Sequence, residues 1–280
     1  MRKTGIPTSA YFGAGDAFDG FIKMKSHGFD CADYQNLVNT ENELFSLTDA
    51  QFEERLVSHK AAAENAGVII NQTHGPWRSP KDATEQDRAE RFEKMTKALW
   101  ATSVLGCKYM AIHPIMPYGC GANPEPERFM ELNIQFFEKL IGEAKKYGVV
   151  ICFENMPFPF LTLSSTSQIG EFVKSMNSEN FKMCLDTGHC AVMKESPADA
   201  IRNYGDIIKI MHVHDNNGTN DLHKFPFDGV IDWEDFGKAL SFMDKNVVLS
   251  LETSASKSAE DWEDKQKELS DRAKKIINFK

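Results

Sequence analysis

The feature that most constrains the fold of this chain is an eightfold alternation of short apolar runs with longer helical stretches. The short runs are rich in β-branched and aromatic residues, whereas apolar residues recur at helical spacing in the segments that follow them. This alternation is typical of repeated βα units, whose strands form a parallel sheet. The predicted strands are Thr4–Ala10, Phe29–Tyr34, Val68–His74, Tyr109–His113, Val149–Asn155, Lys182–Asp186, Ile207–His214 and Val247–Glu252.

The segments between these strands carry signals for helix starts and ends. Thr48 and Gln51 form a capping-box pattern, and Ser196 followed by Pro197 is typical of an N-cap with proline in the first turn. Apolar residues repeat at helical spacing before Gly148, which predicts a helix with one buried stripe that ends at this glycine. We interpret such stripes as core.

Eight units predict a single-domain α/β fold, the (β/α)8 TIM barrel, over residues 1–280. This fold typically uses about 250 residues, and no linker or low-complexity tract divides the sequence. The alternative is an open, doubly wound sheet. It is the weaker interpretation, because the sequence contains neither a GxGxxG turn after the first predicted strand nor a GxxxxGK[ST] phosphate loop.

Composition argues against several classes of protein. Lys and Arg number 32 against 41 Asp and Glu, and the net charge of −9 opposes the phosphate attraction on which broad nucleic-acid binding depends. No apolar run approaches the length of a membrane span or a signal sequence, so we expect no membrane partner. The six cysteines are scattered without a CxxC pair, which favours a cytoplasmic location. The oligomeric state stays open, a homo-oligomer included.

Polar residues of metal-ligand or acid–base type recur where the predicted strands end. In a barrel the carboxyl ends of all strands meet at one mouth, where the catalytic groups of this fold lie. These residues are therefore expected to share one pocket. They are His74, His113, Glu154, Asp186, His212, His214 and Glu252.

Strand alternation predicts that these polar residues point into the barrel. The positions that share their face are small: Ala111, Cys152, Cys184 and Ser250. The intervening positions are bulky and apolar: Ile112, Ile151, Phe153, Met183, Leu185, Met211, Val213, Leu249 and Leu251. An unpaired carboxylate on the inner face would cost on the order of several kcal/mol of desolvation, so a bound divalent metal is the simplest compensation.

Taken singly, each residue has a simpler interpretation. A lone histidine such as His74 or His113 is more often a core residue with its hydrogen bonds satisfied, and Asp186 could merely cap a helix. Glu154 and Glu252 are harder to explain as core, because glutamate is almost never fully buried without a partner. The coincidence of these groups at strand ends favours a functional site.

Further residues could extend this site. His189 adds a ligand-type group just after the sixth predicted strand, and His214 could support His212 from the same strand face. Asp221 and His223 lie in the long segment after the seventh predicted strand, where an ordinary solvated loop is the alternative.

Ligand chemistry narrows the metal. A set of three carboxylates and one imidazole suits Mn²⁺, Co²⁺ or Mg²⁺, whereas the additional histidines favour Zn²⁺. The sequence leaves the choice open, with Mn²⁺ or Zn²⁺ preferred. The four proposed ligands are Glu154, Asp186, His212 and Glu252.

At these residues the chain resembles the xylose-isomerase-like TIM-barrel superfamily, which includes sugar and sugar phosphate isomerases and epimerases and the zinc-dependent AP endonucleases of family 2. The resemblance covers nearly the whole chain. The matching segments are Thr73-His74-Gly75-Pro76, Ile112-His113-Pro114, Phe153-Glu154-Asn155, Leu185-Asp186-Thr187-Gly188-His189, Met211-His212-Val213-His214-Asp215, Asp221-Leu222-His223 and Leu251-Glu252-Thr253.

For an isomerase or epimerase, the resemblance implies that one divalent ion is held by the four proposed ligands. It also implies that Glu154 and Glu252 face the sugar carbons as a catalytic acid–base pair. A metal that chelates adjacent carbonyl and hydroxyl oxygens stabilises an enediolate, while carboxylates remove and return the proton. The expected substrate contacts are His189, His113, His214 and Trp77.

Two comparisons within the superfamily limit this interpretation. Ketose 3-epimerases usually carry an arginine shortly after the strand-seven histidine, but here no arginine follows His212 before Arg272. AP endonucleases hold three zinc ions, and every matching residue is present, with His74, His113, Asp221 and His223 as the additional metal ligands. The scattered arginines and the negative charge argue against DNA as a partner.

The sequence thus predicts a metal-dependent sugar or sugar phosphate isomerase or epimerase of carbohydrate metabolism, which transfers a proton through an enediolate. One alternative is a zinc-dependent phosphodiesterase of the AP endonuclease type. Another is a non-catalytic subunit of the same fold that binds sugar or metal, because retained ligands do not prove turnover.

Overall fold

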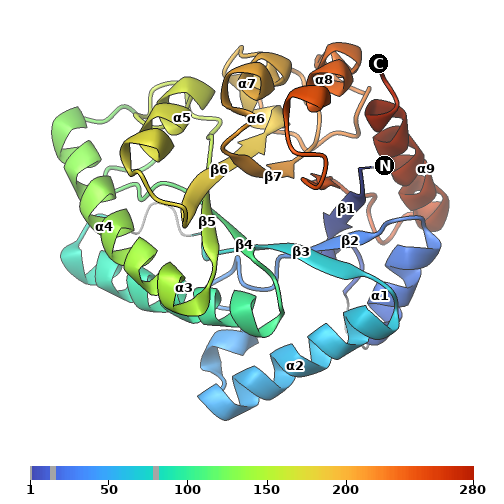
Figure 1. The fold of residues 1–280 in the computed structure, drawn as a ribbon, viewed down its shortest axis with the longest axis horizontal. Helices are drawn as coiled ribbons and strands as arrows, with labels where there is room; N and C mark the ends of the chain where they lie inside the picture. The colour runs from blue at the N-terminus through green and yellow to red at the C-terminus, as the bar shows by residue number, and fades with distance from the viewer. Residues whose placement is uncertain (1, 13–16, 78–81) are drawn as a thin grey trace.

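The computed structural model of the chain describes residues 2–12, 17–77 and 82–280. Parallel strands form a sheet at the centre of the molecule, and helices surround it (Figure 1). The strands are β1 (Thr4–Pro7), β2 (Cys31–Tyr34), β3 (Ile69–His74), β4 (Tyr109–Ile112), β5 (Val150–Glu154), β6 (Phe181–Asp186), β7 (Ile208–His212) and β8 (Leu249–Ser250).

The sheet is closed. Neighbouring strands follow the chain order from β1 to β7, and β8 pairs with β1 in parallel. Between β7 and β8, the Val213 backbone N–H donates to the Ser250 carbonyl oxygen at 2.8 Å, and the Glu252 N–H donates to the Val213 oxygen at 3.0 Å. These hydrogen bonds join the ends of β7 and β8 and so close the sheet into a barrel. The predicted single-domain (β/α)8 TIM barrel is confirmed, and the doubly wound alternative is wrong.

Helices of very different lengths connect the strands. Within the described ranges they are α1 (Ala17–Ser26), α2 (Asp49–Asn65), α3 (Glu85–Val104), α4 (Pro126–Tyr147), α5 (Thr166–Ser175), α6 (Thr187–Val192), α7 (Pro197–Tyr204), α8 (Trp233–Ala239) and α9 (Trp262–Ile277), with 3-10 turns at Thr8–Ala10, Glu43–Ser46 and Leu240–Phe242. None of these described helices is both long and apolar enough to cross a membrane.

The predicted helix signals are confirmed. The Thr48 side chain accepts from the Gln51 backbone N–H, which completes the capping box of α2, and the Ser196 side chain caps α7 ahead of Pro197. The helix α4 ends at Gly148, whose φ of 67° lies in the left-handed region that favours glycine.

All the predicted strands except the sixth extend too far, the first, seventh and eighth by three or four residues. β1 ends at Pro7, because Thr8–Ala10 forms a 3-10 turn in which the Tyr11 N–H donates to the Thr8 oxygen at 2.9 Å. β8 is regular only over Leu249–Ser250. The early end of β1 places a turn, rather than a continuing strand, at the mouth of the barrel.

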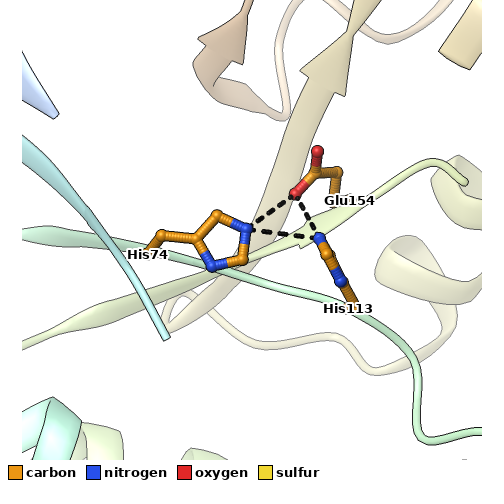
Figure 2. Close-up of side chains that lie close together, drawn as sticks. All are labelled: His74, His113 and Glu154. Atoms are coloured by element: carbon orange, nitrogen blue, oxygen red, sulfur yellow. Dashed lines mark hydrogen bonds and ion pairs between the residues drawn. The ribbon is translucent and has the colours of Figure 1, made fainter. Parts of the chain in front are cut away.

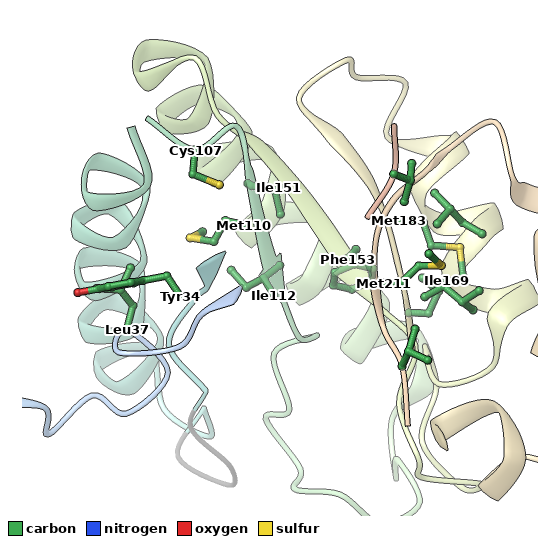
Figure 3. Close-up of a cluster of buried hydrophobic side chains, with 14 of the residues drawn as sticks. Tyr34, Leu37, Cys107, Met110, Ile112, Ile151, Phe153, Ile169, Met183 and Met211 are labelled. Carbon is green, nitrogen blue, oxygen red and sulfur yellow. The ribbon is translucent and has the colours of Figure 1, made fainter. Parts of the chain in front are cut away.

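The strands separate two cores. Their outer faces pack against the surrounding helices, as Figure 3 shows for side chains that include Met110, Ile112, Ile151 and Phe153. The inner face forms a separate small cluster. Its buried members are Ala111, Val150, Cys152, Cys184 and Ile210. The predicted faces are therefore correct, and the small inner residues leave room for long polar side chains above them.

Two glycines of α4 provide a prediction about stability. A methyl group at Gly142 or at Gly148 would meet no atom within 4 Å, so the two positions differ mainly in backbone conformation. Gly142→Ala is expected to stabilise the protein by about 0.5–1 kcal/mol, because alanine loses less backbone entropy in a helix.

Gly148→Ala is expected to destabilise the protein by about 1–2 kcal/mol, because alanine is strained at positive φ. Thermal unfolding of both variants checks the pair. Shifts of the same sign would contradict this account of α4.

Candidate metal and acid–base site

Histidines and carboxylates gather at the carboxyl end of the barrel. They include six of the chain's eight histidines, and hydrogen bonds and ion pairs connect them into one network. Within the described part of the chain, every ion pair of these carboxylates is made with a histidine. The members are Asp33, His74, His113, Glu154, Asp186, His189, His212, His214, Asp221, His223 and Glu252.

The first cluster joins the ends of β3, β4 and β5. His113 Nε2 lies 3.1 Å from Glu154 Oε2, and His74 Nε2 lies 3.6 Å from the same oxygen. Figure 2 shows the three buried side chains pointing toward one another. His74 Nδ1 is 2.8 Å from the Gly75 carbonyl oxygen, so the ring donates there and turns its other nitrogen toward the cluster.

The second cluster shares Glu154 with the first. His212 Nδ1 lies 2.9 Å from Glu154 Oε1 and 3.4 Å from Glu252 Oε2. The two oxygens of Glu154 therefore face different clusters. His212 is fully buried, whereas the side chain of Glu252 is 16% exposed. Of these two residues, only Glu252 is therefore accessible to solvent.

The third cluster is built around Asp186 at the end of β6. Its Oδ1 accepts from the His189 backbone N–H at 2.6 Å and so caps α6, while its Oδ2 lies 3.0 Å from His214 Nε2. The helix cap and the polar site therefore use different oxygens of one carboxylate. His189 Nδ1 lies 2.7 Å from the Asn155 carbonyl oxygen, which leaves Nε2 for Asp221, 3.2 Å away.

The segment after β7 belongs to the site. An antiparallel bridge between Asp215 and Lys224 folds it back, with backbone hydrogen bonds of 2.9 and 2.7 Å. His223 Nε2 consequently lies 3.2 Å from Asp221 Oδ2, and its Nδ1 lies 2.7 Å from the Glu252 carbonyl oxygen. Asp221 and His223 thus lie beside the polar network, although the side chain of His223 remains 42% exposed.

These donors fit a divalent metal. The ligand atoms of several triads lie within 4.8 Å of one another, as in Asp186, His189 and His214. Imidazole nitrogens and carboxylate oxygens are the ligands that Zn²⁺ and Mn²⁺ take in proteins. Some buried atoms of the network also lack hydrogen-bond partners among the described residues, which costs about 1–3 kcal/mol each. They are Asp33 Oδ1, His113 Nδ1, His212 Nε2 and Asp221 Oδ1.

The two glutamates experience opposite electrostatic environments. Burial raises the pKa of Glu252 above its ordinary value. Burial acts in the same direction on Glu154, but His212 and His113 outweigh it and hold the pKa of Glu154 well below its usual range. Glu154 thus stays ionised, whereas Glu252 takes up a proton more readily, a division that suits an acid–base pair.

Three imidazoles of the site have raised pKa values, whereas burial lowers the pKa of His113 to about 4. Burial lowers the pKa of His189, but Asp186 and the hydrogen bond to Asp221 outweigh it and raise this pKa to about 10. The pKa of His223 is about 9, because its hydrogen bond to Asp221 outweighs burial. The pKa of His212 also lies well above its ordinary value, since acidic neighbours overcome the effect of burial.

Metal binding is therefore expected to release protons. A metal takes the neutral imidazole, so each protonated histidine that becomes a ligand must first lose its proton. Because the pKa of His212, the imidazole among the four proposed ligands, is raised, the apparent metal affinity should rise as the pH rises above neutrality, by roughly tenfold per pH unit for each proton released. Calorimetric titration in buffers of different ionisation enthalpy measures the proton count, and zero protons released would contradict this account.

A cavity of about 450 Å³ opens above the clusters. One wall is apolar and contains Val38, Trp77 and Phe158, and the Trp77 ring lies edge-on to His113 with centroids 4.2 Å apart. The polar lining comprises Ser9, Gln35, Asn39, His74, His113, Glu154, His189, Asp221, His223 and Glu252. Among the described lining residues there is no Lys or Arg, while Arg78 lies outside the described residues.

The predicted residues are brought together in one network, but Asp186, His212 and His214 are not among the described residues that line the cavity. His214 was expected to support His212 and to contact substrate, but it is fully buried behind Asp186 and is absent from the described cavity lining. The reason is local, since the Thr187 hydroxyl exchanges hydrogen bonds of 2.7 and 3.0 Å with the His214 backbone and ties it to the start of α6.

The sequence-based prediction missed the contribution of β2 and of the turn after β1. Asp33 lies 3.5 Å from His212, and Gln35 and Ser9 line the cavity. The signal available was an acidic residue near the end of a buried strand, the same signal that identified Asp186 in β6.

The fold and the site together define a TIM barrel with a candidate metal centre at its carboxyl end. The chain belongs to the xylose isomerase-like TIM barrel family, whose family model matches residues 21–276. The predicted superfamily is therefore confirmed.

Related proteins include sugar epimerases. The D-psicose 3-epimerase of Enterocloster bolteae is 22% identical over 208 residues, which cover 70% of this chain and 64% of that protein. An uncharacterized protein of Methanocaldococcus jannaschii is 28% identical over 156 residues, 54% of this chain and 53% of that protein. The matches with the curated relatives span between 53% and 64% of their length.

Solved structures show the same fold. A D-psicose 3-epimerase crystallised in the presence of D-fructose has a TM-score of 0.77 at 17% identity, covering 99% of this chain and 97% of that one. The IolI protein with a bound zinc atom has a TM-score of 0.72 at 19% identity, covering 98% of this chain and 96% of that one.

Proposed function

We propose that this protein is a metal-dependent sugar isomerase or epimerase, which moves a proton through an enediolate. One observation carries the proposal: two glutamates, Glu154 on β5 and Glu252 after β8, line the same cavity and contact the same histidine, His212. The sugar epimerases among the related proteins support it.

The metal would be held by the four ligands expected from the sequence. When bound, a divalent ion polarises a carbonyl oxygen and so makes the neighbouring C–H more acidic. The side chains of the protein would bind the substrate and transfer the proton. Those ligands are Glu154, Asp186, His212 and Glu252.

The two glutamates would remove and return the proton. Glu154 is ionised and held by two imidazoles, while burial raises the pKa of Glu252, so that this glutamate takes up a proton more readily. They come from strands three places apart in the closed sheet, so a substrate between them could be approached from two sides. Such an arrangement suits an epimerase, in which a proton leaves one face and returns to the other.

Other residues of the cavity would bind and orient the sugar. His189 and His113 line the cavity, and Trp77 adds an apolar ring to its wall, which would help to exclude water. We propose an unphosphorylated sugar, because the described lining contains neither Lys nor Arg. Action at carbon 3 of a ketose is less favoured, since the sequence has no arginine between His212 and Arg272.

Solvent exchange tests the proposal. The protein, loaded with Mn²⁺, Co²⁺ or Zn²⁺ and with its metal content measured on the same sample, is incubated with ketoses and aldoses in deuterium oxide. We expect deuterium to enter one substrate carbon during turnover, which mass spectrometry and NMR detect. Turnover without deuterium, as in a hydride shift, would contradict the enediolate mechanism.

A zinc-dependent phosphodiesterase of the AP endonuclease type is the second candidate. The additional donors favour it, since His74 and His113 adjoin Glu154, and His223 adjoins Asp221. This function requires three metal ions per chain and nicking of a duplex that contains an abasic site. One ion per chain with no nicking would exclude it. Tight sugar binding without proton exchange would instead support a non-catalytic subunit.

A further inference from the structure

The strand β2 brings a buried carboxylate to the back of a proposed metal ligand. Asp33 is fully buried, and its Oδ2 lies 3.5 Å from His212 Nε2. The other ring nitrogen, Nδ1, faces the two glutamates at 2.9 and 3.4 Å. His212 therefore lies between Asp33 on one side and the acid–base pair on the other.

The position of Asp33 follows from strand alternation. Its neighbours Ala32 and Tyr34 belong to the outer core, so Asp33 and Gln35 face the barrel interior. Among the residues that the structure describes, neither Asp33 Oδ1 nor His212 Nε2 has a hydrogen-bond partner. Hydrogen bonds in ligand-free sites are often long and tighten when the ligand binds, so the 3.5 Å contact between Asp33 Oδ2 and His212 Nε2 is a candidate for tightening.

An imidazole that binds a metal carries its hydrogen on the opposite nitrogen. If Nε2–H of His212 points at the Asp33 carboxylate, then the lone pair of Nδ1 faces Glu154 and Glu252. A carboxylate behind a ligating histidine fixes both the tautomer and the ring orientation, and it makes the imidazole a stronger donor. The geometry of Asp33 meets this description.

Gln35 links the same carboxylate to Glu252. Its Nε2 donates to Asp33 Oδ2 and to Glu252 Oε1, both at 3.3 Å. Its Oε1 accepts from the Ser9 hydroxyl at 2.9 Å, which fixes the direction of the amide. Glu252 Oε1 is thereby directed to Gln35, while Oε2 is the oxygen that faces His212.

We propose that Asp33 and Gln35 are positioning residues of the metal and acid–base site. Asp33 sets the tautomer of His212 so that Nδ1 faces the metal, and Gln35 holds the carboxylate of Glu252. The inference rests on the metal centre of the proposed function and extends it to β2, a strand to which the sequence-based prediction assigned no role.

Metal binding is the direct test. Co²⁺ affinity is measured by competition with a chromophoric chelator, and the visible spectrum of the bound Co²⁺ reports its coordination. Asp33→Ala is expected to weaken binding by about 10–100-fold and to change the spectrum. Asp33→Asn should lose less, because its amide oxygen still accepts the Nε2–H. Gln35→Leu should also lose less than Asp33→Ala, because His212 keeps its partner.

Asp30 provides a matched control on the same segment. It precedes β2 at the opposite end of the strand and pairs with Lys25 in a half-exposed ion pair. Asp30→Ala and Asp30→Asn should change Co²⁺ affinity by less than about twofold. Circular dichroism shows whether each variant folds, and Asp33→Asn serves as the test should Asp33→Ala fail to fold.

The outcomes separate this inference from the proposed function. Unchanged affinity and spectrum in both Asp33 variants would overturn it even if the protein turns over a sugar, and so would an equal loss in the Asp30 variants. The absence of any Co²⁺ binding by the unmodified protein would overturn it together with the proposed metal centre. The expected loss in a protein that turns over no sugar would support it while contradicting the proposed function.

Discussion

Glu154→Gln is expected to reduce turnover by at least about 10³-fold and to leave the barrel folded. Glutamine has nearly the same shape, but it cannot take up a proton, and loss of a general base alone removes about 10²–10⁴-fold. Glu154 also supplies one oxygen to His113 and the other to His212. The substitution therefore removes a base and a negative charge from two clusters at once.

The measurement compares kcat for the substrate found in the solvent-exchange screen with deuterium incorporation by the same variant. Both should fall together, because both depend on removal of the same proton. Glu179→Gln, a side chain that is 96% exposed, provides the matched control and should retain full activity. A Glu154→Gln protein with normal turnover would exclude Glu154 as the base.

Gly188→Ala is expected to produce the largest loss of stability from a single added methyl group at the site. The new Cβ would lie 2.0–2.7 Å from three atoms of the His214 ring. That ring has no easy escape, because the Thr187 hydroxyl holds the His214 backbone on both its N–H and its carbonyl side. Relief requires the ring to leave its 3.0 Å contact with Asp186.

We expect Gly188→Ala to destabilise the protein by about 3 kcal/mol, at the upper end of the usual effect of overpacking. The melting temperature should fall by roughly 6 °C or more, and metal affinity should fall with it, because Asp186 loses the partner that orients it. Gly142→Ala, where the methyl group meets nothing, is the control. A Gly188→Ala protein that melts like the unmodified chain would show that His214 can move freely.

Much of the fold could be predicted because its determinants are local. The β-branched runs and the helical stripes depend only on residues close in sequence, and so do the capping box at Thr48 and the N-cap at Ser196. The errors occurred where a distant contact decides the outcome. Directly after β1 ends at Pro7, the Thr8 hydroxyl accepts from the backbone N–H of Gln35, which follows the neighbouring strand β2.

The candidate site was predictable to the extent that a barrel brings every strand end to one mouth. This geometry identified Glu154 and Glu252 without any knowledge of their contacts. The same signal was present at Asp33, an acidic residue near the end of a strand, but only the closed barrel shows that this carboxylate lies 3.5 Å from His212. The position of the strand ends also could not show whether a loop residue such as Asp221 joins the site or faces the solvent.

The sequence alone determined which residues form strands, which faces of those strands are small, and which polar groups reach the mouth. The tertiary structure decided their partners: which oxygen of Glu154 faces which histidine, that His214 supports Asp186, and that Gln35 bonds to Glu252 from 217 residues away. The physical reason is the distance along the chain between the residues that interact. Secondary structure follows from the order of neighbouring residues, whereas a hydrogen bond across the mouth is made only once all eight strands have closed and packing has fixed the side chains.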